Sequence, residues 1–223
     1  MKSLKKPTFD EERKLWKRRF EYVIGIDEVG RGAFAGPIIA AAVVFEATGS
    51  YHEDIAEIND SKLLDPNKRK ELAKKIKQTA KLYSIAKIGV STINKKGIGK
   101  ATEMAFRKVL RQVYTETRRG SQDKLKIKNF FVLVDGYPIK YLPGGLKNQK
   151  AIIKGDQKSI SIAAASIIAK VYRDSFMMEF HKKYPQYGIA NHKGYGTKEH
   201  RENLRIYGLS KIHRTSFNLS KYS

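Results

Sequence analysis

Four acidic residues occupy positions where carboxylates can hold divalent metal. Asp27 and Glu28 end an apolar, β-prone run, and Asp135 ends a second such run. Asp156 stands just before an alanine-rich segment. Clustered carboxylates raise each other's pKa and stay ionised together mainly when cations lie between them. Their oxygen atoms suit Mg²⁺ or Mn²⁺, and two such ions about 4 Å apart can activate water and stabilise a leaving oxygen at phosphorus.

Each acid also has a simpler interpretation as a turn or helix-cap residue. For Asp135, which precedes a glycine at the end of a strand, the turn role is the better explanation when that residue is taken alone. It is weaker for Asp27 and Glu28, because neighbouring strand residues face opposite sides and both acids follow an apolar run. The four acids together favour a site, although the sequence does not show whether they converge.

Asp174 competes with Asp156 for the fourth position. The two are 18 residues apart in a segment that predicts one helix, and 18 residues of helix span roughly 27 Å. One compact site cannot use both. We favour Asp156, because it lies beside a helix N-terminus, where backbone N–H groups attract phosphate. Asp174, directly after Arg173, is interpreted as part of a surface ion pair.

Three further segments could bind nucleic acid. In Gly30-Arg31-Gly32 the glycines either supply turn geometry or bring peptide groups against a sugar while Arg31 meets phosphate; beside two carboxylates we prefer the second. Tyr195, between two glycines, could stack on a base or pack over a loop, and the sequence favours neither. Lys62 in Asp60-Ser61-Lys62 is a weaker candidate for a phosphate contact.

The elements that must position these residues alternate between strands and helices. Apolar and alternating runs predict strands at 23–27, 38–45, 81–90, 130–134 and 151–153, the first two being antiparallel neighbours joined by a glycine-rich turn. Helices are expected at 66–79, with Asp65 as N-cap, at about 101–117, and from Ser159 or Ser161 to about 183. Residues 1–20 predict a short basic helix or arm. This order indicates a mixed sheet packed by helices.

The composition narrows the class of partner. The chain of 223 residues has 45 basic and 22 acidic residues, a net charge of +23, which favours a polyanionic partner. No apolar run approaches the roughly 20 residues that span a bilayer. We expect nucleic acid and not a membrane surface, because no helix pairs a basic face with a large aromatic face. The absence of cysteine excludes disulfides and thiolate zinc sites, leaves His192 and His200 as poor zinc ligands, and fits a reducing cytoplasm.

The motifs together resemble ribonuclease HII. The resemblance starts in Gly25-Ile-Asp-Glu-Val-Gly-Arg-Gly-Ala-Phe-Ala-Gly-Pro37 and covers about residues 20–217 in order. It continues in short motifs around the other candidate residues: Asn59-Asp-Ser-Lys62, Val134-Asp-Gly136, Lys154-Gly-Asp156, Ser161 to Asp174, Tyr184 to Gly188, His192 to Thr197 and His213 to Phe217. Ala33-Phe34 depart from the more usual Pro-Leu, but no departure affects an acid.

The resemblance implies an α/β chain with the ribonuclease H-like fold, a mixed five-stranded sheet flanked by helices with a helical C-terminal extension. We expect a basic N-terminal arm or helix at 1–20, a catalytic domain at 21–183, and a basic helical segment at 184–223 packed on that domain. A monomer is expected. Twenty residues are too few to form the extra N-terminal substrate-binding domain of ribonuclease HIII.

The resemblance also implies an activity and residue roles. The family cuts the RNA strand of RNA–DNA hybrids, and cuts 5′ to single ribonucleotides in duplex DNA, leaving 3′-hydroxyl and 5′-phosphate ends. Its metal-binding acids match Asp27, Glu28, Asp135 and Asp156, with Mg²⁺ or Mn²⁺ as the ions. Its reader of the ribonucleotide 2′-hydroxyl matches Gly30-Arg31-Gly32, its junction tyrosine matches Tyr195, and Lys62 matches a phosphate contact. The alternatives are a two-metal nuclease or resolvase that needs no 2′-hydroxyl, and a non-catalytic hybrid-binding protein.

Overall fold

A computed structural model describes residues 6–47, 55, 57–58, 61, 64–119, 129–140, 145–219 and 222. Lys62 lies outside these residues, so its predicted phosphate contact stays a prediction. Five strands form one mixed sheet in the order β3-β2-β1-β4-β5. They are β1 (Tyr22–Val29), β2 (Ile38–Phe45), β3 (Leu82–Ile88), β4 (Phe130–Asp135) and β5 (Gln149–Ile152). The first three pair antiparallel, whereas β4 runs parallel to β1 and β5 parallel to β4.

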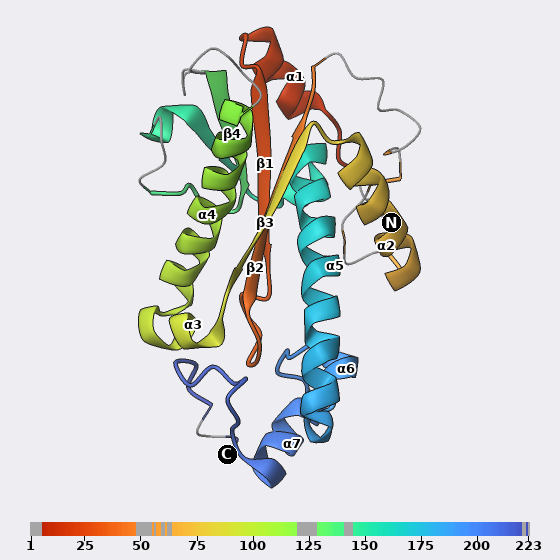
Figure 1. Cartoon of the computed structure of the whole chain (residues 1–223), viewed down its shortest axis with the longest axis vertical. Helices are drawn as coiled ribbons and strands as arrows, with labels where there is room; N and C mark the ends of the chain where they lie inside the picture. Colours follow the sequence, from red (N-terminus) through yellow and green to blue (C-terminus); the bar gives the residue numbers. More distant parts are fainter. Residues whose placement is uncertain are drawn as a thin grey trace.

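Helices cover both faces of this sheet. They are α1 (Asp10–Lys17), α2 (Pro66–Thr79), α3 (Val90–Lys96), α4 (Ile98–Arg119), α5 (Ile160–Lys183), α6 (Ile189–His192) and α7 (Lys198–Tyr207), with short 3₁₀ turns η2 (Gly145–Asn148), η3 (Gly155–Gln157) and η4 (Pro185–Tyr187). Figure 1 shows α3 and α4 on one face of the sheet, α5 and α2 on the other, and α1 and α7 at opposite ends. The predicted mixed five-stranded sheet flanked by helices is confirmed.

The predicted elements are present, but several bounds differ. β3 spans Leu82–Ile88 where 81–90 was predicted, and β5 spans Gln149–Ile152 where 151–153 was predicted. Asp65 caps α2 by accepting hydrogen bonds from the backbone N–H groups of Asn67 and Lys68, and the Ser159 hydroxyl caps α5. The helix predicted at about 101–117 is longer, and a separate short helix, α3, precedes it. Gly97 divides the two helices because it adopts φ +75°, a conformation that glycine takes without strain.

Small residues bring α5 close to the sheet. Ala163, Ala164 and Ala165 are fully buried against β1 and β2. A Cβ atom on Gly25 of β1 would lie 2.1 Å from the backbone carbon of Ser161, so the strand and the helix touch backbone to backbone there. This contact fixes the position of α5 relative to the end of β1, where Asp27 and Glu28 stand.

A buried carboxylate attaches the N-terminal helix. Glu12 of α1 has no exposed surface, and its Oε1 accepts hydrogen bonds from the Ser159 hydroxyl at 2.6 Å and the Ser161 N–H at 2.9 Å. Burial raises the pKa of Glu12. Leu15 adds an apolar contact to the cluster that holds Val23 and Ile152. The division of the chain into units 1–20, 21–183 and 184–223 stays a prediction.

Three buried histidines hold the C-terminal segment together. The His192 and His200 rings stack with centroids 4.4 Å apart, and Nε2 of His200 lies 3.2 Å from Nε2 of His213. The Ser210 N–H donates to Nδ1 of His213, so the proton of a neutral His213 stands on Nε2, which donates to His200. His200 then donates from Nδ1 to the Tyr195 carbonyl at 2.9 Å. This chain of donors requires both rings to be neutral.

We expect His200 and His213 to resist protonation. Burial lowers the pKa of each to about 4, from an ordinary value of 6.5. The folded state therefore binds fewer protons than the unfolded state between these values, so the stability that the pair contributes is present above 6.5 and is lost as pH falls towards 4. In a proton NMR titration, both Cε1–H signals should keep their neutral positions down to about pH 5. A signal from either ring that titrates near its ordinary pKa would contradict this assignment.

Candidate active site

The ends of β1 and β4 place three of the predicted acids around one cavity. Ile26 pairs with Val134, so Asp27 and Asp135 stand side by side at the same level of two parallel strands. Their side chains face α5, whereas Glu28 faces the opposite side of the sheet. Asp27, Glu28 and Asp135 all line a cavity of about 470 Å³.

Two carboxylates of this cavity have raised pKa values, because too little positive charge lies near them to offset their burial and mutual repulsion. Burial, followed by the charges of Glu28 and Asp135, raises the pKa of Asp27 well above its ordinary value. Burial, opposed by Arg31, raises the pKa of Glu28 to about 7. Hydrogen bonds from the Ser166 side chain and, at 2.7 Å, from the Glu28 N–H favour the charged form of Asp27 but do not outweigh these effects. Cations bound between the acids would remove the repulsion.

The fourth predicted acid lies beside this group but does not line the cavity. Asp156 is buried in η3, and the N–H of the preceding Gly155 donates to Asp135 Oδ1 at 2.7 Å. Among the described residues, no three His, Asp or Glu side chains are grouped so that they hold a metal ion as they stand. The four acids supply hard oxygen donors, which suit Mg²⁺ or Mn²⁺. The convergence of all four on metal stays a prediction.

The turn after β1 forms the next wall of the cavity. Gly30, Arg31 and Gly32 all line it, and the exposed Arg31 guanidinium lies 3.7 Å from Glu28. Two buried arginines, which the sequence analysis did not assign to the site, support the turn. Arg173 donates to the carbonyls of Pro37, Lys193 and Ala35, and Arg214 donates to those of Gly36 and Arg31. The positions of these arginines in the sequence do not indicate that they support the turn. The only sequence signal for them is that they lie within motifs shared with the family.

Backbone pairing brings Tyr195 to the same cavity from far along the chain. Tyr195 bridges to Ala33, and the Phe34 N–H donates to the Gly194 carbonyl at 2.8 Å. The Tyr195 side chain is 36% exposed and lines the cavity, so its ring is accessible for the predicted stacking on a base or sugar. The Arg173 guanidinium lies 5.3 Å from the centroid of its ring. Phe34, where the family more usually has leucine, contacts the turn at Gly196.

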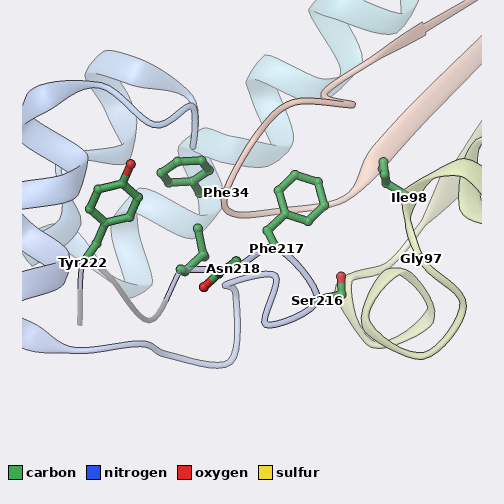
Figure 2. A pocket seen from close by; sticks show the side chains of 8 residues that line it. Phe34, Gly97, Ile98, Ser216, Phe217, Asn218 and Tyr222 are labelled. Atoms are coloured by element: carbon green, nitrogen blue, oxygen red, sulfur yellow. The ribbon is translucent and has the colours of Figure 1, made fainter.

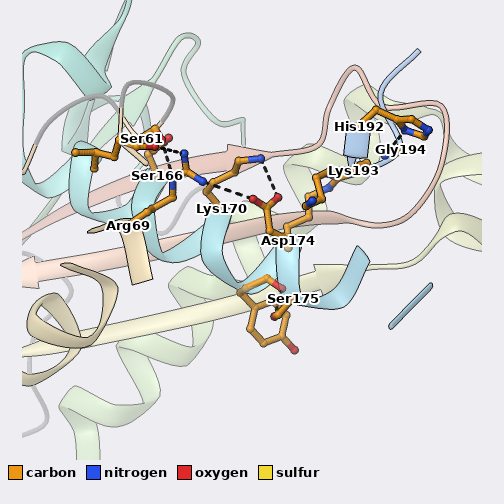
Figure 3. A network of polar contacts seen from close by, with 12 residues as sticks. Ser61, Arg69, Ser166, Lys170, Asp174, Ser175, His192, Lys193 and Gly194 are labelled. Atoms are coloured by element: carbon orange, nitrogen blue, oxygen red, sulfur yellow. Dashed lines mark hydrogen bonds and ion pairs between the residues drawn. The ribbon is translucent and has the colours of Figure 1, made fainter. Parts of the chain in front are cut away.

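Asp174 belongs to a different network from the one predicted. Its neighbour Arg173 points into the core, so the expected surface pair with that residue is wrong. Asp174 instead pairs with Lys170 at 2.8 Å and with Arg69 at 3.6 Å (Figure 3). Lys170, Ser166 and Ser61 line the cavity, and the Ser61 and Ser166 hydroxyls are 3.0 Å apart.

A separate apolar cavity of about 400 Å³ lies between the C-terminal segment and the start of α4 (Figure 2). The residues that line it are Phe34, Gly97, Ile98, Ser216, Phe217, Asn218, Leu219 and Tyr222. None of these carries a charge, so this cavity offers no group for acid–base or metal chemistry. The acidic cavity at the end of β1 is therefore the candidate active site.

Within residues 6–47, 64–119, 129–140 and 145–219, no helix is both long and apolar enough to cross a bilayer.

Comparisons with known proteins agree with the resemblance read from the motifs. The family model described as ribonuclease HII matches residues 24–220. Ribonuclease HII of Acholeplasma laidlawii is 46% identical over 209 residues, covering 92% of each chain, and that of Caldicellulosiruptor bescii is 44% identical, covering 94% of this chain and 92% of the relative. The crystal structure of ribonuclease H2 from Pyrococcus horikoshii has a TM-score of 0.68 at 26% identity, covering 90% of this chain and 95% of that one. The chain therefore belongs to the ribonuclease HII family of endoribonucleases, whose activity is the hydrolysis of RNA paired with DNA.

Proposed function

We propose that this protein cuts the phosphodiester on the 5′ side of a ribonucleotide, both in RNA–DNA hybrids and at a single ribonucleotide in duplex DNA. The products would carry 3′-hydroxyl and 5′-phosphate ends. The observation that carries the proposal is one shared cavity: Asp27, Glu28 and Asp135 line it together with Gly30-Arg31-Gly32 and Tyr195. A sugar held against the turn therefore places its phosphate beside the carboxylates.

The acids provide the binding set for divalent metal. Asp27, whose pKa is raised by the charges of Glu28 and Asp135, would hold the ions together with Glu28, Asp135 and Asp156. When bound, the ions supply Lewis acidity, which activates water and stabilises negative charge at phosphorus. The structure of Bst-RNase HIII in complex with Mn²⁺ shares the fold, with a TM-score of 0.67 at 18% identity. Mg²⁺ and Mn²⁺ are both appropriate ions for the assay.

The turn supplies the selection of substrate. A site built to hydrogen-bond one hydroxyl strongly rejects the analogue that lacks it, because its polar groups are then left unpaired. Peptide groups of Gly30-Arg31-Gly32 would bind the 2′-hydroxyl, which DNA lacks. Tyr195 would pack against the neighbouring sugar or base. The buried guanidiniums of Arg173 and Arg214 keep this turn rigid.

Three matched duplexes test the proposal. One is all DNA, one has a single ribonucleotide at a fixed position, and one is an RNA–DNA hybrid, each labelled at the 5′ end and incubated with Mg²⁺ or Mn²⁺. We expect cleavage 5′ to the ribonucleotide and in the hybrid, no cleavage of all-DNA duplex, and a product end that DNA polymerase extends. Equal cutting of the all-DNA duplex would indicate a general nuclease. Binding without cleavage would indicate a non-catalytic hybrid-binding protein.

A further inference from the structure

Lys170 is a cation of the active-site cavity to which the mechanism above gives no role. It stands on α5 one turn after Ser166, the residue that hydrogen-bonds Asp27. Among the described residues that line the cavity, Lys170 and Arg31 carry positive charge. The Arg31 side chain is 53% exposed at the rim, whereas that of Lys170 is 18% exposed. Lys170 is thus the more enclosed of these two cations.

Two neighbours fix the position of Lys170. Its Nζ donates to Asp174 Oδ1 at 2.8 Å, and the other oxygen of Asp174 lies 3.6 Å from Arg69 (Figure 3). Arg69 is itself buried and donates to the carbonyls of Ser61 at 2.7 Å and Leu64 at 2.5 Å. One oxygen of Asp174 is therefore positioned by the guanidinium of Arg69, and the other oxygen accepts the hydrogen bond from Lys170.

Stability alone does not account for this arrangement. An ion pair four residues apart on a helix contributes little, and the order found here, with the lysine nearer the N-terminus, is the less favourable one. Burial lowers the pKa of Lys170, which shows that placing its charge here has a cost. The three carboxylates of the cavity would repel a phosphodiester, so a cation among them favours substrate binding.

We propose that Lys170 is a substrate-binding residue whose ammonium group contacts a phosphate of the nucleic acid, and that Asp174 and Arg69 are positioning residues that aim it into the cavity. The contacted phosphate would adjoin the nucleotide held by Gly30-Arg31-Gly32, because Lys170 and this turn line the same cavity. Its four-carbon stem lets the ammonium move between Asp174 and the phosphate. This inference rests on the proposed function for its substrate.

The test compares Lys170→Met with wild type in binding to the single-ribonucleotide duplex. Binding is measured by fluorescence anisotropy without divalent metal, over a series of salt concentrations. Loss of one phosphate contact should weaken binding about tenfold at low salt and reduce the slope of log affinity against log salt by about 1. Lys170→Arg should restore the slope. Asp174→Asn keeps the ammonium group, so it should keep the slope while kcat falls severalfold.

The same helix offers a matched control pair. Lys182 and Glu179 form an ion pair at 2.8 Å, with side chains 70% and 62% exposed, and neither lines the cavity. Lys182→Met should bind and cleave like wild type.

Three outcomes decide the inference. A Lys170→Met protein with wild-type salt slope and affinity would overturn it, and a lowered unfolding temperature alone would then mark the lysine as structural. Loss of binding equal to that in Lys182→Met would also overturn it, because any lysine on α5 would then serve. If wild type binds the duplex but does not cut it, the proposed function fails while the binding measurement still decides the role of Lys170.

Discussion

Replacing Asp27 by asparagine should abolish cleavage while making the metal-free protein more stable. Asp27 is 5% exposed and is the acid whose pKa both Glu28 and Asp135 raise. Asparagine has nearly the same shape but no charge, so it removes the charge of a proposed metal ligand without leaving a cavity. We expect kcat to fall at least about a thousandfold, comparable to removal of other preorganised charge-stabilising groups.

Asp27→Asn should lower activity but raise the stability of the metal-free protein. A carboxyl whose pKa is raised on folding binds more protons in the folded state, so its contribution to stability decreases as pH rises. For Glu28, with a folded pKa of about 7 against an ordinary 4.5, that decrease falls between these two values, and the direction for Asp27 is the same. Thermal unfolding above pH 7 should therefore show a higher midpoint for Asp27→Asn than for wild type without metal. Added Mn²⁺ should raise the midpoint of wild type more than that of the variant.

An exposed aspartate provides the control. Asp10, with a side chain 66% exposed and an ion pair to Arg13, does not line the cavity, and Asp10→Asn should leave cleavage unchanged. Cleavage at the wild-type rate by Asp27→Asn would remove this residue from the active site. Asp135→Asn should lose activity as well, because it stands level with Asp27 on the neighbouring strand.

The sequence predicts most of the scaffold because its signals are local. The apolar runs of β1 and β2, the Asp65-Pro66 start of α2 and the serine start of α5 each depend on neighbouring residues only. The break at Gly97 was harder to place, because a helical pattern with glycines does not say which glycine leaves the helical conformation. Side-chain pattern alone also could not give the parallel pairing of β4 with β1, which joins residues about a hundred positions apart.

The candidate site depends more on contacts between distant segments. Asp27 and Glu28 are adjacent in sequence, but Tyr195 reaches them only because the backbone of 194–195 pairs with 33–34. Arginine is seldom fully buried, yet Arg173 and Arg214 are, because backbone carbonyls of the turn accept their hydrogen bonds. Asp174 was given the wrong partner for the same reason, since helix geometry turns Arg173 inwards while Asp174 meets Lys170 one turn earlier.

The largest structural effect should come from a single methyl group, in Gly30→Ala. Gly30 has φ +95°, and a Cβ atom there would lie 2.1 Å from Nε of Arg173. Arg173 cannot move aside at low cost, because its guanidinium is buried and hydrogen-bonded to three carbonyls. The backbone strain should cost about 1–3 kcal/mol, and the overpacking a similar amount.

Gly30→Ala should also impair cleavage by the fraction of the protein that remains folded. The turn stands between the carboxylates and Tyr195, so displacing it by about 1 Å misplaces the ribose relative to the acids and should lower kcat/KM about a hundredfold. The same change should weaken the preference for a ribonucleotide over a deoxyribonucleotide, because the peptide groups that we propose to bind the 2′-hydroxyl move with the turn. Cleavage of the single-ribonucleotide and all-DNA duplexes, measured side by side, gives both kcat/KM and the preference for ribose over deoxyribose.

A glycine with open space around it separates this effect from the general cost of adding a side chain. Gly89 has φ −76°, and its added Cβ would meet nothing within 4 Å, so Gly89→Ala should match wild type in unfolding and in cleavage. If Gly30→Ala also matched wild type, the turn would be free to shift, and the support that we assign to Arg173 would be wrong. If Gly30→Ala lost stability but kept its discrimination between ribose and deoxyribose, the 2′-hydroxyl would have to be read elsewhere in the cavity. Loss of both would place recognition of the sugar on the same rigid turn that joins Asp27 and Glu28 of β1 to the C-terminal segment.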